Sequence, residues 1–293
     1  MICLRPAAIS LRATRSTPHL GLTFYDMVIV RDIGKWIPRV KFGQVAVAAT
    51  AVETPGTFWA LRPALRTSSR LKDMPEVTIN GPAGRLEGRY THNKSPNAPI
   101  ALVLHPHPQH GGTMNNRVVY TLFQSFVASG FSTLRINFRG VGRSQGKYDR
   151  GEGEMNDAAT AVDWLQTYNP QASAIWIAGF SFGAWIGMQL LMRRPEFDGF
   201  VVVSPPANLY DFTFLAPCPS SGLILQGDKD DLVSEPAVAK LAEKIAKQRG
   251  LAIDYRVIPG ANHFFADQQE ILAEHITGYL KKATEGRLAA VGE

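Results

Sequence analysis

From residue 74 onward, short apolar runs alternate with segments of helical periodicity, and this alternation constrains the fold more than any other feature of the sequence. Residues 100–104 form an uninterrupted apolar run, which is typical of a strand buried on both faces of a parallel sheet. The repetition of strand, helix and strand predicts an α/β protein with a doubly wound, mostly parallel sheet. Further apolar runs lie at residues 131–138, 174–179, 199–203, 222–226 and 253–258, and helical patterns at residues 158–165, 182–190, 238–245 and 271–279.

An antiparallel strand pair is predicted to open this region. Residues 77–79 and 85–90 have strand-like composition, and the turn sequence Asn80-Gly81-Pro82 follows the first of them. Later in the chain, only residues 204–221 separate two predicted strands, so we expect little or no lid over the ligand site. The apolar residues in that connection either wall an acyl pocket or simply pack the connection, and the sequence leaves both open; they are Pro205, Pro206, Leu209, Tyr210, Phe212 and Phe214.

The excess of positive charge lies at the amino end of the chain. Residues 1–73 contain 11 Lys and Arg against 4 Asp and Glu, which leaves 31 − 11 = 20 against 25 − 4 = 21 in residues 74–293. We therefore expect an α/β domain at 74–293 that binds no nucleic acid, preceded by an extension at 1–73. That extension is interpreted as sequence upstream of a start at Met74 or as an organelle transit peptide; a secretory signal is disfavoured because arginines interrupt its apolar stretch.

A glycine-flanked serine follows the apolar run 174–179. Gly179-Phe180-Ser181-Phe182-Gly183 matches the G-x-S-x-G nucleophile elbow, in which a sharp strand-to-helix turn exposes the serine at the end of the sheet. A predicted strand precedes the motif and a predicted helix follows it, as that turn requires. Ser181 is therefore the candidate nucleophile, and the alternative is an incidental serine in a glycine-rich turn.

A serine nucleophile needs a neighbouring base, and in the order serine, acid, histidine that base lies downstream. Two histidines follow Ser181. His263 follows the predicted strand 253–258, at the strand end where ligands bind in doubly wound sheets, whereas His275 lies inside the last predicted helix. The sequence favours His263 as the base.

The acid is expected after the preceding strand, where three aspartates occur close together. Asp230 is preferred because it stands midway between Gly227 and Val233. Asp228 is expected to brace the turn, and Asp231 is expected to face solvent. Both remain alternatives to Asp230 as the acid.

Stabilisation of an oxyanion requires two N–H donors. One is expected from the backbone of Phe182, directly after the nucleophile. The other is expected from His107, whose amide is an isolated donor between Pro106 and Pro108, because proline has no N–H. His107 is thus predicted to act through its backbone.

These motifs together resemble those of the α/β-hydrolase superfamily, and in particular a small bacterial family with an HPHP loop that is similar to dienelactone hydrolases and serine esterases. The resemblance covers about residues 76–281 and leaves 1–73 unmatched. It implies an α/β-hydrolase fold and a triad of Ser181, Asp230 and His263, but it names no substrate. Its motifs are His105–Pro108, Gly111–Met114, Asn137–Ser144, Gly179–Gly183, Gly227–Asp230 and Asn262–Phe265.

The sequence therefore predicts a serine hydrolase of carboxylic esters or thioesters with small acyl groups. A peptidase or an acyltransferase with the same triad, and a binding protein without activity on the same fold, are the alternatives. No cofactor is expected. A zinc site at His105, His107 and His110 lacks further ligands, and the glycines at 140–146 miss the dinucleotide-binding spacing by one residue.

The expected partner is a small acyl substrate. No run approaches the roughly 18 apolar residues of a membrane span, so no membrane partner is expected. Cys3 and Cys218 show no ligand or disulfide spacing, which favours a reducing compartment and a cytoplasmic location. The sequence leaves the oligomeric state open, a homodimer included.

Overall fold

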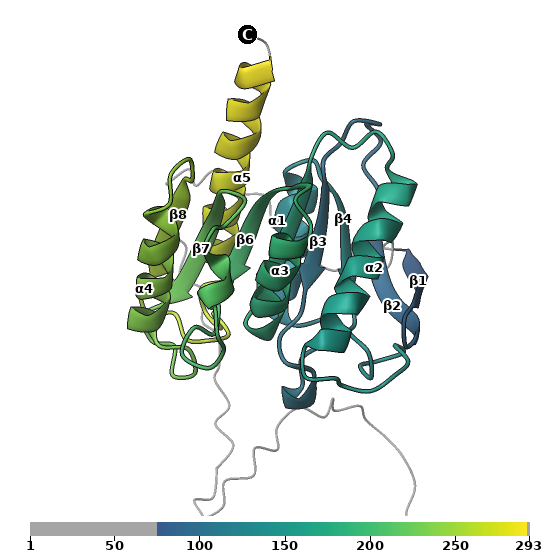
Figure 1. Ribbon diagram of the computed structural model, residues 1–293, viewed down its shortest axis with the longest axis horizontal. Helices are drawn as coiled ribbons and strands as arrows, with labels where there is room; N and C mark the ends of the chain where they lie inside the picture. Colours follow the sequence, from purple (N-terminus) through teal and green to yellow (C-terminus); the bar gives the residue numbers. More distant parts are fainter. Residues whose placement is uncertain (1–74, 292–293) are drawn as a thin grey trace, which may run out of the picture. The chain divides into compact units, whose positions relative to one another are not determined.

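The computed structural model of the protein describes residues 75–291, with side chains through residue 285 (Figure 1). The predicted extension at residues 1–73 and the predicted start at Met74 lie outside the described residues.

The described residues form an eight-stranded sheet. Its strands are β1 (Glu76–Gly81), β2 (Gly84–Thr91), β3 (Ile100–Leu104), β4 (Ser132–Ile136), β5 (Ile175–Phe180), β6 (Phe197–Val203), β7 (Gly222–Gly227) and β8 (Ile253–Ile258). Their spatial order is β1-β2-β4-β3-β5-β6-β7-β8. Strand β2 runs antiparallel to both β1 and β4, and all other neighbours are parallel. The prediction of a mostly parallel sheet with an antiparallel opening pair is confirmed.

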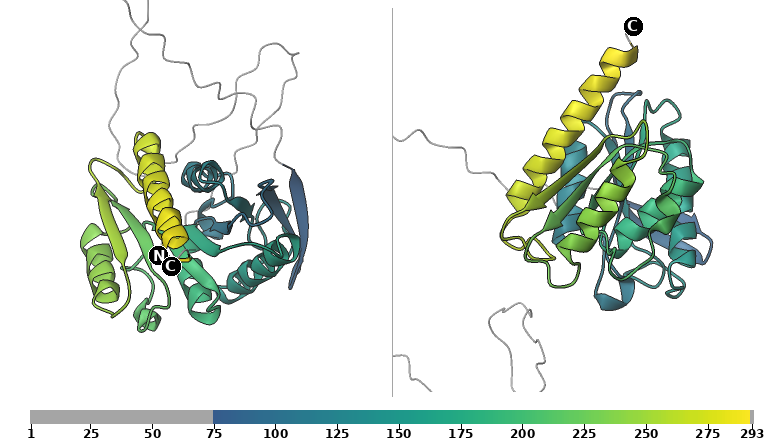
Figure 2. Two further views of the ribbon diagram at one scale, coloured as in Figure 1. Left: turned by 90° about the horizontal axis from the view of Figure 1, so that it is seen from above. Right: turned by 60° about the vertical axis from the view of Figure 1, so that its left-hand side comes forward.

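Helices cover both faces of the sheet (Figures 1 and 2). Helices α2 (Glu152–Tyr168), α3 (Phe182–Arg193) and α4 (Glu235–Ala246) lie on one face. Helices α1 (Arg117–Ala128) and α5 (Gln269–Val291) pack against each other on the opposite face. Helix α1 was not among the helices predicted, although its buried positions have helical spacing: Val118, Val119, Leu122, Phe123 and Phe126.

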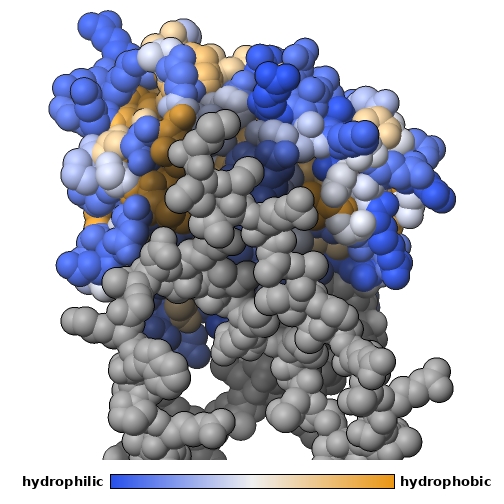
Figure 3. Space-filling view, turned by 90° about the horizontal axis from the view of Figure 1, so that it is seen from below, coloured by the Kyte–Doolittle hydropathy of each residue, from blue (hydrophilic) through white to orange (hydrophobic). Residues whose placement is uncertain are grey.

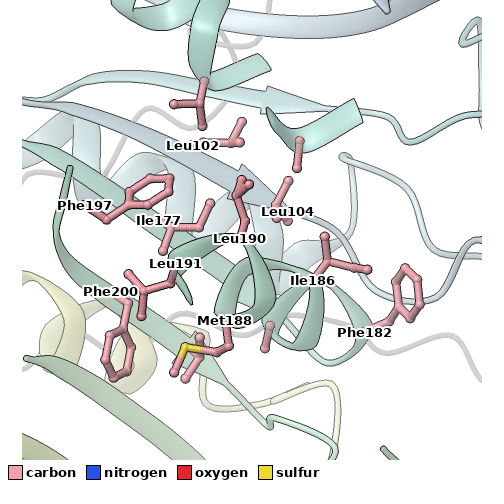
Figure 4. Packing of buried hydrophobic residues seen from close by; sticks show 14 of the residues in the cluster. Leu102, Leu104, Ile177, Phe182, Ile186, Met188, Leu190, Leu191, Phe197 and Phe200 are labelled. Carbon is pink, nitrogen blue, oxygen red and sulfur yellow. The ribbon is translucent and has the colours of Figure 1, made fainter. Parts of the chain in front are cut away.

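The core consists of two hydrophobic clusters, one on each face of the sheet. Side chains alternate along β3, so that Leu102 and Leu104 join the cluster under α2, α3 and α4, while Ala101 and Val103 join the other. Figure 4 shows the first cluster, where side chains of α3 such as Leu190 pack against those of β3 and β5. Because the central strands are buried on both faces, they appear in the sequence as continuous apolar runs.

The connection between β6 and β7 is short and contains only one turn of 3-10 helix, η3 (Thr213–Leu215). Within the described chain, no lid covers the carboxyl ends of the parallel strands, which lie at the lower edge in Figure 1. Figure 3 looks onto this edge, where hydrophobic side chains show between hydrophilic ones in the described part of the surface. Among residues 75–291, no helix has the length and apolar character needed to cross a membrane.

Candidate active site

Ser181 occupies the sharp turn between β5 and α3. Its φ of 53° and ψ of −119° lie in a backbone region that residues other than glycine rarely adopt. The turn is held by the N–H of Ser181, which donates to the carbonyl of Val203 at 2.9 Å. A Cβ at Gly179 would lie 2.4 Å from the backbone of Gly183, and one at Gly183 would lie 2.5 Å from the carbonyl oxygen of Leu104. Both glycines are therefore required for the close approach of strand and helix.

His263 and Asp230 form a hydrogen-bonded pair at the ends of β8 and β7. Nδ1 of His263 lies 2.8 Å from Oδ2 of Asp230, and the side chains are 7% and 0% exposed. Burial disfavours the charged carboxylate, but hydrogen bonds from His263 and from the N–H of Val233 outweigh it and lower the pKa of Asp230. The ionised carboxylate accepts the Nδ1 proton, which leaves the lone pair of the His263 imidazole on Nε2.

The three candidate acids differ in their contacts. Only Asp230 contacts His263. Asp228 accepts a hydrogen bond from the N–H of Gly260 at 2.6 Å and so braces the turn, while Asp231 is exposed to solvent. Asp230 is the one acid of the three in the geometry that a triad requires.

Ser181 and His263 line one pocket, with a volume of about 300 Å³. The wall from the β6–β7 connection consists of Pro206, Leu209 and Tyr210. The other candidates from that connection do not line it; Phe212 is buried in the core, and Phe214 packs against the same cluster. Part of the connection thus lines the pocket, and part of it packs against the core. The described lining contains no Asp, Glu, Lys or Arg; its members are Pro106, His107, His110, Gly111, Gly112, Asn116, Ser181, Phe182, Pro206, Leu209, Tyr210, Leu232, Val233, His263 and Phe264.

The two predicted oxyanion donors also lie at this pocket. The rings of His107 and Phe182 are 4.9 Å apart, and both residues line the cavity. Neither backbone N–H donates to an acceptor within the described residues. Both N–H groups are thus unused within the described residues, which an oxyanion hole requires of its donors.

His105 locks the loop that carries His107. Its Nε2 accepts the N–H of Phe138 at 3.0 Å, and its Nδ1 lies 2.6 Å from the carbonyl oxygen of Pro106. Burial lowers the pKa of His105 to about 4, so the ring is neutral and donates from Nδ1. Both nitrogens are engaged within the protein, so His105 has no lone pair to offer a metal. The described residues contain no group of three or more His, Cys, Asp or Glu placed to hold a metal ion.

Tyr148, which the sequence analysis did not single out, supports the same loop. Nδ1 of His107 accepts the N–H of Gln109 at 3.2 Å, so Nε2 carries the proton and donates to the hydroxyl of Tyr148 at 3.1 Å. Tyr148 lies between β4 and α2, 41 residues from its partner, and no local motif marks it. Asn116 and Leu232 are likewise marked by no motif. Phe264 lies within the motif Asn262–Phe265 and Val233 beside the candidate acids, but neither was predicted to line the pocket.

The glycine-rich loop after β4 is anchored beside the site. Arg139 donates to both carboxylate oxygens of the buried Asp157 at 2.8 and 3.0 Å, which ties the loop to α2. Gly140 and Gly142 adopt positive φ angles of 74° and 57°. No helix opens at 140–146, so the segment lacks the helix N-terminus on which a dinucleotide site depends.

The sheet order, the nucleophile elbow and the histidine-aspartate pair define the class: this is an α/β hydrolase, and its described residues include no lid. A family model described as X-Pro dipeptidyl-peptidase (S15 family) matches residues 76–269, and the chain belongs to this family.

Three similar proteins each cover more than two thirds of this chain. An uncharacterized protein from Rickettsia prowazekii is 56% identical over 211 residues, which cover 71% of this chain and 89% of the relative. The structure of a protein of unknown function from Agrobacterium tumefaciens, grouped with the α/β hydrolases, is 57% identical with a TM-score of 0.71 and covers 72% of this chain and 97% of its own. A serine hydrolase without lid from Xanthomonas campestris is 28% identical with a TM-score of 0.63 and covers 76% and 97%.

Proposed function

We propose that the protein hydrolyses carboxylic esters or thioesters of small, uncharged acyl groups. Ser181 is the nucleophile, His263 the general base and Asp230 the residue that orients His263. The observation that carries this proposal is the convergence of a strained serine and a carboxylate-bound imidazole on one pocket. The similarity to serine hydrolases supports it.

In the proposed reaction, Oγ of Ser181 attacks the carbonyl carbon while Nε2 of His263 takes the hydroxyl proton. The carbonyl oxygen becomes an oxyanion, which accepts hydrogen bonds from the N–H groups of Phe182 and His107. The bond to the leaving oxygen or sulfur then breaks, and His263 returns the proton to it. Water, activated by the same imidazole, hydrolyses the acyl-enzyme and releases the acid.

The pocket favours an acyl substrate over a peptide with a free amino terminus. An enzyme that releases an X-Pro dipeptide binds an α-ammonium group close to the scissile bond, and a desolvated ammonium requires an acidic partner. The described pocket lining contains no carboxylate. With about 300 Å³, the pocket is also at the small end of ligand sites, which fits a short acyl group.

Active-site labelling tests the nucleophile independently of the natural substrate. We expect a fluorophosphonate to form one adduct, mapped to Ser181 by peptide mass spectrometry. Ser181→Ala is expected to abolish the adduct and to lower turnover by roughly 10³ to 10⁶-fold with unchanged circular dichroism. Ser95→Ala is the matched control, because Ser95 is exposed to solvent but lies outside the pocket. An adduct elsewhere, or none on the folded protein, would favour a binding protein.

A substrate panel tests the acyl class. Short-chain esters and thioesters are expected to turn over at least tenfold faster, by kcat/KM, than X-Pro amides with a free amino terminus. The reverse order in a protein whose labelling maps to Ser181 would establish the peptidase alternative.

A further inference from the structure

A second cavity, separate from the serine pocket, has a buried arginine in its wall. It measures about 400 Å³ and lies where α1, β4 and the start of α5 meet; its lining residues are Asn115, Arg117, Tyr120, Thr121, Arg135 and Gln269. Arg135 is only 3% exposed and belongs to β4. The proposed hydrolysis uses none of these residues.

The guanidinium of Arg135 is only partly satisfied. Its Nη1 donates to the carbonyl of Met114 at 2.6 Å and to Oδ1 of Asn115 at 3.1 Å. Its Nε is buried and has no hydrogen-bond partner among the described residues. The rings of Tyr120 and Phe123 lie 5.3 and 5.1 Å away and provide cation–π contacts.

No carboxylate among the described residues neutralises this charge. Neither Arg135 nor Arg117 forms an ion pair within that part of the chain. Burial lowers the pKa of Arg135 to about 10, so the group stays charged at neutral pH. A buried, charged group without a counter-ion is costly unless a ligand compensates it.

The polar groups among the lining residues are mainly hydrogen-bond donors. Oδ1 of Asn115 is already taken by Arg135, which leaves its amide nitrogen free to donate. Gln269 is also used within the protein, because it accepts from Thr121 at 2.6 Å and donates to the carbonyl of Phe264 at 2.9 Å. The residues that line the cavity thus include two arginines, an asparagine and Tyr120, and the described lining contains no acidic side chain.

We infer that this cavity binds a phosphate group, either as the free ion or as part of a small phosphate monoester. Two guanidinium groups match the charge of a phosphate dianion, and their planar donors match its oxygens. Two short links connect the cavity to the serine pocket: Asn116 follows Asn115, and Phe264 is held by Gln269. A bound phosphate therefore stabilises segments that line the serine pocket.

Isothermal titration calorimetry of the full chain with inorganic phosphate, at constant ionic strength set with sodium chloride, tests the inference. We expect one saturable site per chain. Arg117→Gln is expected to weaken binding by about tenfold or more, because it removes a charge-assisted contact. The Arg117 side chain is exposed and has no ion-pair partner among the described residues, so this variant retains the fold.

Arg249→Gln is the matched control, because Arg249 is exposed, far from the cavity in sequence and of equal charge. It and Ser181→Ala are expected to bind phosphate within twofold of the unmodified chain. Titration with glycerol phosphate distinguishes a phosphate monoester from the free ion. Tighter binding of glycerol phosphate than of inorganic phosphate indicates that the ligand is a monoester. Absence of a saturable site, equal weakening in Arg117→Gln and Arg249→Gln, or loss of binding in Ser181→Ala would each overturn the proposal, whatever the outcome for the esterase reaction.

Discussion

Replacement of Asp230 by asparagine tests the proposed triad through the tautomer of His263. Oδ1 of Asp230 accepts the backbone N–H groups of Leu232 and Val233 at 3.0 and 2.8 Å, while Oδ2 accepts from His263 at 2.8 Å and from Nε2 of Gln226 at 3.1 Å. In Asp230→Asn, the amide oxygen is expected to keep the two backbone donors, because these cannot change role, whereas His263 can change tautomer and Gln226 can turn its unpartnered Oε1 toward the new amide. The amide nitrogen then faces Nδ1 of His263.

This orientation has a kinetic consequence. An amide that donates to Nδ1 moves the imidazole proton to Nε2, so that His263 no longer accepts the proton of Ser181. We expect kcat to fall by about 10⁴-fold, which corresponds to roughly 5 kcal/mol of transition-state free energy. The fold should persist, because the side chain keeps its volume and most of its hydrogen bonds.

The assay is hydrolysis of a fluorogenic short-chain ester, with the rate of fluorophosphonate labelling as a readout that needs no natural substrate. Asp230→Ala is the informative control, since it leaves His263 free to adopt either tautomer. We expect the asparagine variant to be at least as impaired as the alanine variant, although it is closer in shape. Activity of Asp230→Asn within tenfold of the unmodified protein, with unchanged circular dichroism, would refute the reasoning. Asp228→Asn should retain activity.

Two further predictions concern the stability of the site. Gly183→Ala places a Cβ 2.5 Å from the carbonyl oxygen of Leu104, so we expect slower fluorophosphonate labelling and a loss of about 1–3 kcal/mol in the free energy of unfolding, measured in urea. The pKa of His105 falls from 6.5 to about 4 on folding, so the unfolded chain binds its proton first as the pH drops. Neutral His105 therefore contributes its full stabilisation above about pH 6.5, and this contribution is lost as the pH falls toward 4. The free energy of unfolding is expected to drop by about 2 kcal/mol between pH 7.5 and pH 5. His105→Gln should show a flatter dependence on pH over this range, and an equally steep one would contradict the assignment.

The layered fold and the location of the chemistry could be predicted from the amino-acid sequence alone. Apolar runs such as 100–104 mark central strands because these are buried on both faces. The candidate catalytic residues directly follow predicted strands, and parallel strands bring their carboxyl ends to one edge of the sheet. Ser181 and His263 could therefore be placed near each other without a structure. Proline and glycine also have local effects on the backbone, which is why the turn at Ser181 and the loop at His107 could be recognised in advance.

Which side chains touch one another became clear only from the folded chain. Three aspartates within four residues all fit the local pattern, and the contact with His263, 33 residues away, distinguishes Asp230 from the others. Tyr148 and the cavity around Arg135 depend in the same way on elements that are far apart in the chain. Periodicity encodes which face of an element is buried, but it does not encode which side chains meet across elements, because that follows from the packing of the whole sheet and its helices.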